Sequence, residues 1–203
     1  MDILIGTRNP YKATEMIRFL EGIEGINIHN LDELAERIII EEDQNSLLGN
    51  ARKKAMEISK HTCWYVLTSD GGVDIPGLGN KWDRLKNQRT VGENKTDREK
   101  VETLLKLMAG LKGDNRKCSY CLAIALAKDN KLLWSFEDVT ENGYIVEYSQ
   151  DTAIPSGRWM GHIWYYPHFK KTFNQTTEVE KNEIRKMAGN LKEKLQKYLR
   201  EIA

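Results

Sequence analysis

The N-terminal segment pairs a short apolar run with a helical stripe, and this pairing constrains the fold more than any other feature of the chain. The run, residues 2–7, contains Ile3-Leu4-Ile5 and stops at a turn signal, as a buried strand of a parallel sheet does. The apolar residues that follow are spaced three and four apart: Ala13, Met16, Ile17 and Leu20. That spacing gives a helix one apolar face, and Gly22 and Gly25 then end the helix. A strand followed by such a helix predicts an α/β fold.

Further strands and helices alternate along the chain. Apolar runs predict strands at residues 26–31, 64–69, 118–127, 131–138 and 144–146. Apolar stripes predict helices at residues 47–58, 101–108 and 184–202. Asp129-Asn130 is typical of a hairpin turn. Residues 76–94 are rich in glycine, asparagine, lysine and arginine, and are expected to form a long loop or lid.

The charge balance excludes a strong global field. The 203 residues include 31 Lys and Arg against 30 Asp and Glu, a net charge of +1, which gives no surface-wide attraction for nucleic acid or an anionic membrane. Any phosphate binding must therefore be local. The length favours a single domain, residues 1–203, and no stretch approaches the about 20 apolar residues that a membrane span needs.

The N-terminus and the cysteines predict a cytoplasmic protein. Residues 1–6 are too short and too acidic for a signal peptide, and three cysteines give no disulfide framework. Cys63 is expected to be a buried small hydrophobe. Cys118 and Cys121 have the spacing of a redox or zinc pair, but residues three apart on a strand point to opposite faces, so both are expected to lie in the core.

The segment Thr7-Arg8-Asn9-Pro10-Tyr11-Lys12 is the first candidate for binding an anion. A strand-to-helix turn presents unpaired backbone N–H groups and the positive end of a helix dipole. Thr7 and Asn9 add side-chain donors, and Lys12 in the first helical turn can reach a phosphate oxygen. Many strand–turn–helix units contain these residue types without binding phosphate, so the loop alone leaves a purely structural role open.

Acidic residues at two further places are candidates for a metal site. Glu41 and Glu42 precede the second helix, and Asp70 is expected at a strand end on the flexible backbone of Gly71-Gly72. Mg²⁺ bound to a polyphosphate needs only one or two protein carboxylates, because water and phosphate oxygens fill its other positions. Taken alone, each acid can equally cap a helix or form a turn.

Three cations are candidates for neutralising a phosphoryl group: Lys54, Arg89 and Lys181. Lys54 shares one side of its helix with Asn50, four residues earlier. Taken singly, each cation is more often a solvated surface residue.

In order and spacing, these segments resemble the inosine triphosphate pyrophosphatase family (the Ham1-like, or XTP/dITP, diphosphatases) over nearly the whole chain. The segment from Thr7 to Lys12 is similar to the family's T-x-N-x-x-K loop. Glu41-Glu42, followed by Asn50-Ala51 and Lys54-Ala55, is similar to E-E…N-A-x-x-K-A. Residues 66–73 are similar to V-L-A-D-D-S-G-L, with Asp70 on the second, catalytic aspartate and Ser69 replacing the first.

Three more landmarks follow in family order. Residues 87–92 are similar to S-A-R-F-A-G, which places Arg89 on the family's arginine. Lys171-Thr172-Phe173 and Glu180-Lys181-Asn182 match the K-T-F and E-K-N landmarks. The phosphate-binding half of the family pattern is therefore kept.

The departures fall on the motifs that hold the purine ring in the family, G-F-G-Y-D-P and S-H-R. Counting back from Pro167, residues 158–163 occupy the first motif, so His162 stands where a base-reading aspartate is expected. Arg185-Lys186-Met187 replaces S-H-R. A carboxylate only accepts hydrogen bonds, whereas a neutral imidazole offers one donor and one acceptor, so the favoured base edge is expected to change.

The resemblance implies an elongated mixed α/β sheet with flanking helices, in two lobes around a central cleft, and a homodimer. It implies a Mg²⁺-dependent enzyme that cleaves a nucleoside triphosphate, of a non-standard or modified purine, to the monophosphate and pyrophosphate. Glu41 or Glu42 would hold the metal with Asp70, which would also activate water. The catalytic residues implied are Asp70, Lys12 and Lys54. The substrate-binding residues implied are Thr7, Arg8, Asn9, Lys12, Lys54, Gly71, Arg89, Trp159, His162, Lys181 and Arg185, with Trp159 stacking on the base.

Other functions stay open. One is a pyrophosphatase for a different base, either another modified purine or a pyrimidine triphosphate. A second is a nucleotide-binding protein without catalysis, which retention of Asp70, Lys12 and Lys54 disfavours. Nucleic-acid binding through the basic residues 81–89 is disfavoured by their acidic neighbours.

Overall fold

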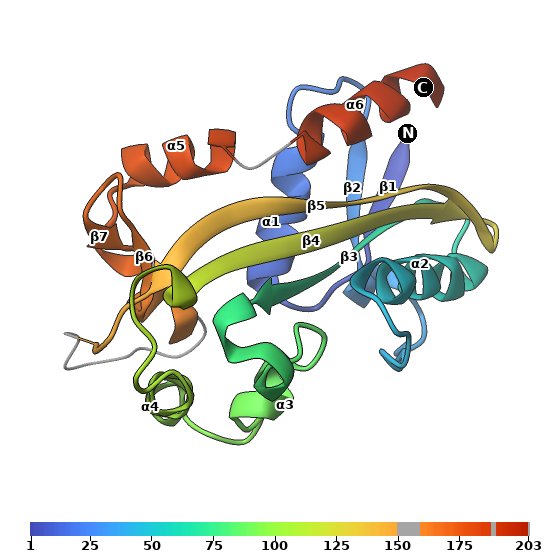
Figure 1. Ribbon diagram of the computed structural model, residues 1–203. Coiled ribbons are helices and arrows are strands. Elements are labelled where there is room, and N and C mark those ends of the chain that lie inside the picture. The colour runs from blue at the N-terminus through green and yellow to red at the C-terminus, as the bar shows by residue number, and fades with distance from the viewer. Residues whose placement is uncertain (150–158, 188–189, 203) are drawn as a thin grey trace. The chain divides into compact units, whose positions relative to one another are not determined.

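The sheet has seven strands and mixed direction (Figure 1). A computed structural model describes residues 1–149, 159–187 and 190–202. In chain order the strands are β1 (Asp2–Ile5), β2 (Asn27–Asn30), β3 (Tyr65–Asp74), β4 (Lys117–Lys128), β5 (Lys131–Ile145), β6 (Trp164–Tyr166) and β7 (Lys171–Thr172). Their order in the sheet is β2-β1-β3-β4-β5-β6-β7. β1 pairs in parallel with β2 and β3, whereas β6 pairs antiparallel with β5 and β7. The expected mixed α/β class is confirmed.

The helices differ from the sequence prediction in two regions. They are α1 (Pro10–Leu20), α2 (Leu47–Ile58), α3 (Asn87–Val91), α4 (Asp97–Leu107), α5 (Glu178–Met187) and α6 (Leu191–Ile202). The prediction of a long loop at residues 76–94 was wrong in part, because this segment contains α3 and a short 3-10 helix, Pro76–Lys81. The predicted C-terminal helix is two helices, since α5 ends before α6 begins; the poor helix former Gly189 falls between them in the sequence.

Two strands are longer than predicted. The runs 131–138 and 144–146 belong to one strand, β5. The strand that was expected to end at Asp70 continues to Asp74, so the backbone at Gly71-Gly72 is strand and no flexible turn. Between β4 and β5, Asp129 and Asn130 have φ of 49° and 58°, the left-handed values that a tight hairpin turn requires, and the predicted hairpin is confirmed.

The described residues form two compact units. Unit 1 contains residues 1–71, 122–138 and α6. Unit 2 contains residues 72–121 and 139–187. β3, β4 and β5 each contribute residues to both units. The single domain over residues 1–203 stays a prediction.

In unit 1, α1 and α6 contact each other (Figure 1), and Ile58 of α2 forms a buried apolar cluster with Leu4 and Val66. Ile3, Leu4 and Ile5 are fully buried, as the apolar run predicted. α6 buries Leu191, Leu195 and Leu199, which its helical spacing puts on one face. Gln196 of α6 donates from Nε2 to the carbonyls of Phe19 and Glu21, so α6 also satisfies the C-terminal end of α1.

A buried arginine organises unit 2. Arg116 donates its guanidinium hydrogens to the carbonyls of Met108, Leu111, Ile145 and Val146. These bonds satisfy carbonyls after α4 and at the end of β5. Burial lowers the pKa of the guanidinium, and the four carbonyls replace the water that a buried cation loses.

The cysteines confirm one prediction and contradict another. Cys118 and Cys121 are buried in β4, as the strand-core interpretation requires, and burial raises the pKa of the Cys118 thiol. The prediction for Cys63 was wrong, since Cys63 is exposed. It lies in the bend that precedes β3. Across the described ranges, no helix is long and apolar enough to cross a membrane.

A histidine cluster joins the start of β1 to β2 and the short helix that follows it. The His29 ring stacks on Trp64 with centroids 3.7 Å apart. Its Nδ1 lies 2.7 Å from Glu33 Oε2, and its Nε2 lies 3.2 Å from Asp2 Oδ1. The hydrogen bond with Glu33, and then that with Asp2, raise the pKa of His29 above its ordinary 6.5. The hydrogen bond with His29 in turn lowers the pKa of Glu33.

This cluster predicts a loss of stability at alkaline pH. Because the folded-state pKa of His29 is raised, its contribution is full below about pH 6.5 and is lost as the pH rises through the folded-state pKa. The free energy of unfolding, measured with urea at about pH 6 and about pH 9, should therefore fall more in the wild type than in His29→Gln. His61→Gln, which changes an exposed histidine, should keep the wild-type fall. An equal fall in His29→Gln and the wild type would contradict the prediction.

The end of β1 approaches β3 so closely that only glycine fits there. The Gly6 amide donates to the Leu67 carbonyl at 2.8 Å. A Cβ on Gly6 would lie 2.5 Å from Thr68 Cγ2 and 3.1 Å from Ile58 Cδ1. The turn into the candidate phosphate loop therefore starts from a position without room for a side chain.

Gly6→Ala should lower the free energy of unfolding by about 1–3 kcal/mol, because the new methyl group overpacks the contact with Thr68. Thr68→Ser removes the clashing Cγ2 and keeps the hydroxyl, which donates to the Ala51 carbonyl at 2.7 Å. The double variant should recover part of the loss, and urea unfolding of the four proteins in a double-mutant cycle measures this coupling. Strictly additive effects would show that the close contact is not the cause.

Candidate active site

Asp70 is the centre of the candidate site in unit 1. β1 pairs with β3 only at Tyr65, Val66 and Leu67, so Asp70 lies beyond the carboxyl end of β1. Its side chain is only 7% exposed. Ser69, which replaces the family's first aspartate, points elsewhere: its hydroxyl donates to Met16 Sδ of α1 at 3.3 Å. The site therefore has one buried carboxylate where the family pattern has two adjacent aspartates.

Two ammonium groups face one oxygen of this carboxylate. Asp70 Oδ1 lies 3.5 Å from Lys54 Nζ and 3.7 Å from Lys12 Nζ. Lys54 comes from α2, and Lys12 from the first turn of α1. Glu42 Oε1 lies 2.8 Å from Lys54 Nζ. The structure thus brings together four of the predicted residues, two cations and two anions, in one cluster.

The cluster changes the acidity of Lys12. Burial, and then the neighbouring Lys54 ammonium, lower the pKa of Lys12 from its ordinary value, whereas Asp70 and Glu42 act in the opposite direction. A lowered pKa means that the Lys12 ammonium is incompletely compensated. An anion that arrives at Lys12 would supply the missing negative charge.

The segment from Thr7 to Lys12 differs from the expected anion site in its backbone. Asn9 caps α1: its Oδ1 accepts from the amides of Tyr11 at 3.0 Å and Lys12 at 3.3 Å. Thr7 Oγ1 accepts from the backbone amide of Asn9 at 3.2 Å. The prediction of unpaired amides was therefore wrong for Tyr11 and Lys12. In these bonds Thr7 and Asn9 accept through side-chain oxygens. The Thr7 hydroxyl hydrogen and the side-chain Nδ2 hydrogens of Asn9 can therefore still be donated to a ligand.

Arg8 has a different role from its neighbours in this loop. It donates to the Ile38 carbonyl at 2.9 Å, and its Nε lies 3.7 Å from Asp32. These contacts fasten the loop to the segment that precedes Glu41-Glu42. Substrate binding by Arg8 stays a prediction.

The predicted metal ligands have suitable chemistry. Glu42 and Asp70 both contact Lys54. Among the described residues, Glu41 shows no contact with Lys12 or Lys54. In the described part of the chain, no three Asp, Glu, His or Cys side chains gather as a metal site. Two carboxylates still fit Mg²⁺, which favours oxygen ligands and takes the others from phosphates and water.

The predicted cations of unit 2 have partners three or four residues away in the sequence. Arg89 is mostly exposed and pairs with Glu93, Nε to Oε1 3.3 Å. Lys181 Nζ lies 2.7 Å from Glu178 Oε1 and 5.6 Å from the centroid of the Phe173 ring. Arg185 donates to Asn182 Oδ1 at 2.8 Å. Their roles toward a substrate stay predictions.

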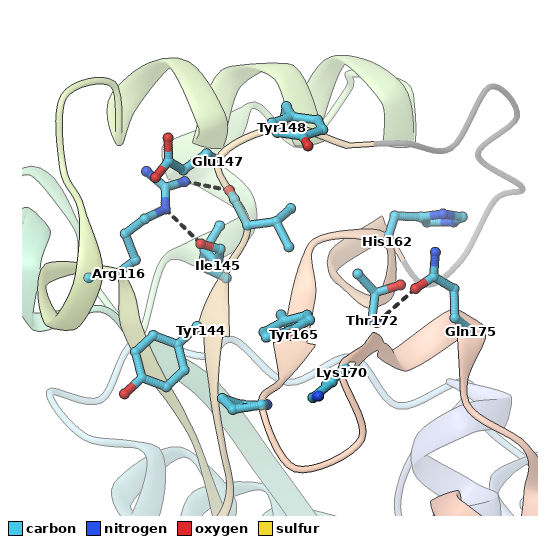
Figure 2. Close-up of a pocket in the computed structure, with 13 residues that line it drawn as sticks. Arg116, Tyr144, Ile145, Glu147, Tyr148, His162, Tyr165, Lys170, Thr172 and Gln175 are labelled. Carbon is cyan, nitrogen blue, oxygen red and sulfur yellow. Dashed lines mark hydrogen bonds between the residues drawn. The ribbon is translucent and has the colours of Figure 1, made fainter.

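The predicted base-binding residues of unit 2 fall in two environments. Trp159 is 5% exposed and packs in the core, so its ring offers little surface for stacking on a base. His162 lines a cavity of about 490 Å³ together with Tyr165 and Gln175 (Figure 2). Figure 2 also shows Arg116 and Glu147 on the opposite side of this cavity. Arg158 of the same motif, and the side chain of Met187, lie outside the described residues.

One residue of the site had no predicted role. Asn50 is 4% exposed and donates from Nδ2 to Asp70 Oδ2 at 3.0 Å. Its Oδ1 accepts from the backbone amide of Gln44 at 3.0 Å. Two sequence signals involved Asn50: its position on the same side of α2 as Lys54, and its place in the segment that is similar to N-A-x-x-K-A. That spacing indicates a shared face and cannot identify the carboxylate which both residues contact.

The sequence and the fold are similar to those of known proteins. The sequence matches the Ham1 family over residues 3–196. It is 29% identical to the dITP/XTP pyrophosphatase of Clostridium perfringens, over 98% of this chain and 97% of that protein. It is 30% identical to the dITP/XTP pyrophosphatase of Bacillus subtilis, over 98% and 96%. A HAM1 protein from Coxiella burnetii has a TM-score of 0.81 at 26% identity, covering 99% of both chains. The chain therefore belongs to the Ham1 family.

Proposed function

We propose that this Ham1-family enzyme hydrolyses a nucleoside triphosphate to the monophosphate and pyrophosphate, with Mg²⁺ held by Glu42 and Asp70. The observation that carries the proposal is the buried Asp70 carboxylate, which faces the ammonium groups of Lys12 and Lys54 at 3.7 and 3.5 Å. The dITP/XTP pyrophosphatases that match 98% of the chain support the substrate class.

The cationic side of the cluster accounts for binding of the triphosphate. Phosphate oxygens would replace the carboxylates as partners of Lys12 and Lys54, and this exchange is favoured because the Lys12 ammonium is incompletely compensated. The Thr7 hydroxyl and the side-chain amide of Asn9 would donate further hydrogen bonds from the adjoining loop. Mg²⁺, when bound, would neutralise charge on the phosphates.

Asp70 would act on the attacking water. Its carboxylate accepts a proton from water as the water oxygen bonds to the α-phosphorus, and the bond from that phosphorus to the bridging oxygen breaks. Pyrophosphate leaves with the electron pair of the broken bond. Lys12 and Lys54 stabilise the charge that develops, and Arg89 and Lys181 are predicted to contribute.

The base preference is proposed to differ from that of the named relatives. His162 provides an imidazole at the cavity in unit 2 where the family motif has a carboxylate, so the donors and acceptors offered to a base differ. Non-standard or modified purine triphosphates are the proposed substrates, and another base is the alternative. A homodimer and a cytoplasmic location accompany the proposal as predictions.

Asp70→Asn should lower kcat for pyrophosphate release by at least about 100-fold, because the amide cannot accept the proton from water. Release is measured with dITP, XTP and Mg²⁺. Asp74→Asn changes an exposed carboxylate of the same strand and should keep wild-type turnover. Unchanged turnover in Asp70→Asn would remove Asp70 from the mechanism. Binding of nucleotide by the wild type without release of pyrophosphate would favour the non-catalytic alternative.

A panel of standard, deaminated and modified triphosphates tests the base preference. The ratio of kcat/KM between a non-standard purine and its standard counterpart should exceed about 10, and His162→Ala should change this ratio by at least about 10-fold, since one pocket contact contributes about 1–3 kcal/mol. His168→Ala, at an exposed histidine paired with Glu183, should leave the ratio unchanged. A ratio that His162→Ala does not alter would exclude His162 from base reading.

A further inference from the structure

One face of α2 holds the acidic loop, residues 41–44. Lys54 Nζ contacts Glu42 at 2.8 Å, Lys53 Nζ contacts Asp43 at 2.7 Å, and Asn50 Oδ1 accepts from the Gln44 amide at 3.0 Å. Residues three and four apart lie on the same side of a helix, so these three contacts come from adjacent positions of α2. Three successive residues of the loop, Glu42, Asp43 and Gln44, are therefore bound to the helix.

The loop also packs directly on the first turn of α2. Ser46 caps the helix by accepting from the Gly49 amide at 2.9 Å. A Cβ on Gly49 would lie 2.9 Å from Ser46 Oγ and 3.0 Å from Gln44 Cβ, so no side chain fits between loop and helix. The position of the loop thus follows the position of α2.

Asn50 and Lys54 each make a second contact with Asp70, but the bond of Asn50 is buried and goes to the other carboxylate oxygen, Oδ2. While its oxygen holds Gln44, its Nδ2 donates to Asp70 Oδ2 at 3.0 Å. The reverse orientation of the amide would place its NH₂ group against the Gln44 N–H and its oxygen against a carboxylate oxygen. The hydrogen-bond network therefore determines the orientation. An amide of this length supplies a donor and an acceptor together, which aspartate and leucine cannot.

We propose that Asn50 is a positioning residue that fixes the Asp70 carboxylate and the acidic loop relative to each other. The proposal rests on the proposed function, because it assigns Asn50 to the same reaction. By holding Oδ2, Asn50 prevents rotation of the carboxylate and leaves Oδ1 facing Lys12 and Lys54. By holding Gln44, it keeps Glu42 near the same carboxylate. Asn50 itself does not touch the reacting atoms.

Two variants separate the two bonds of Asn50. Asn50→Asp keeps an oxygen for the Gln44 amide but places a second carboxylate oxygen against Asp70. Asn50→Leu removes both bonds. Two readouts are needed: kcat and KM for pyrophosphate release from dITP with Mg²⁺, and hydrogen exchange of the Gln44 amide, measured by NMR without nucleotide.

Asn50→Asp should lower kcat by about 10–100-fold, the usual effect of losing a residue that orients an active-site group. KM should change less than about 3-fold, because Asn50 does not contact the nucleotide. The Gln44 amide should stay protected from exchange in Asn50→Asp, and should exchange at least about 10-fold faster in Asn50→Leu, where its acceptor is gone. A merely structural asparagine would not separate these two readouts.

Asn27→Asp is the matched control. Asn27 lies in β2 of the same unit and also donates from Nδ2 to a carboxylate, Asp2 Oδ1, at 3.1 Å. Its replacement should leave kcat and the exchange of Gln44 at wild-type values. Amide spectra establish that each variant is folded. If Asn50→Asp is unfolded, Asn50→Leu continues the test, because it adds no charge beside Asp70.

The outcomes distinguish this proposal from the proposed function. Wild-type kcat in a folded Asn50→Asp or Asn50→Leu would overturn the positioning role, as would a Gln44 amide that stays protected in Asn50→Leu. A wild-type protein that releases no pyrophosphate from any triphosphate would overturn the proposed function, while the exchange of Gln44 would still show whether the bridge exists.

Discussion

The structure of unit 1 depends on compensating one buried carboxylate, Asp70, which has little access to water. An ion removed from water without partners costs several kcal/mol, so each of its oxygens must be compensated. Lys12 and Lys54 compensate Oδ1, and Asn50 compensates Oδ2. These partners come from the first turn of α1 and from one face of α2. The carboxylate therefore dictates where both helices lie relative to β3, and Gly6 permits the close approach of β1 that starts α1 there.

The same compensation prepares the site for a ligand more negative than itself. Glu42 and Asp70 balance the two lysines in charge, yet burial still lowers the pKa of Lys12, so the balance is incomplete. A triphosphate brings more negative charge than the carboxylates supply. Under the proposed function, binding of the phosphates would recover part of the cost of gathering two cations in the folded protein. The same ion pairs would then set both the stability of unit 1 and its affinity for the triphosphate.

How much the sequence could predict depended on whether a residue's partner was local. The buried strand Ile3-Leu4-Ile5 and the α/β class were predictable, because apolar periodicity reflects burial. The motif residues around Asp70 were predictable only through their family spacing. Two features could not be predicted: the hydrogen bonds that engage the backbone amides of Tyr11 and Lys12, and the bridge through Asn50. A sequence does not show which of several acceptors a donor finds. The exposure of Cys63 and the continuation of β3 depend on neighbouring chain segments, and local composition contains no information about those segments.

The two halves of the family pattern are under different physical constraints, and this explains why one is kept while the other changes. A change at Asp70 removes the buried partner that Lys12 and Lys54 share, and a change at either lysine removes one of the two ammonium groups that face Asp70, which costs stability. A base contact carries no such penalty. Under the proposed function, the imidazole of His162 would read the base in place of the family's carboxylate.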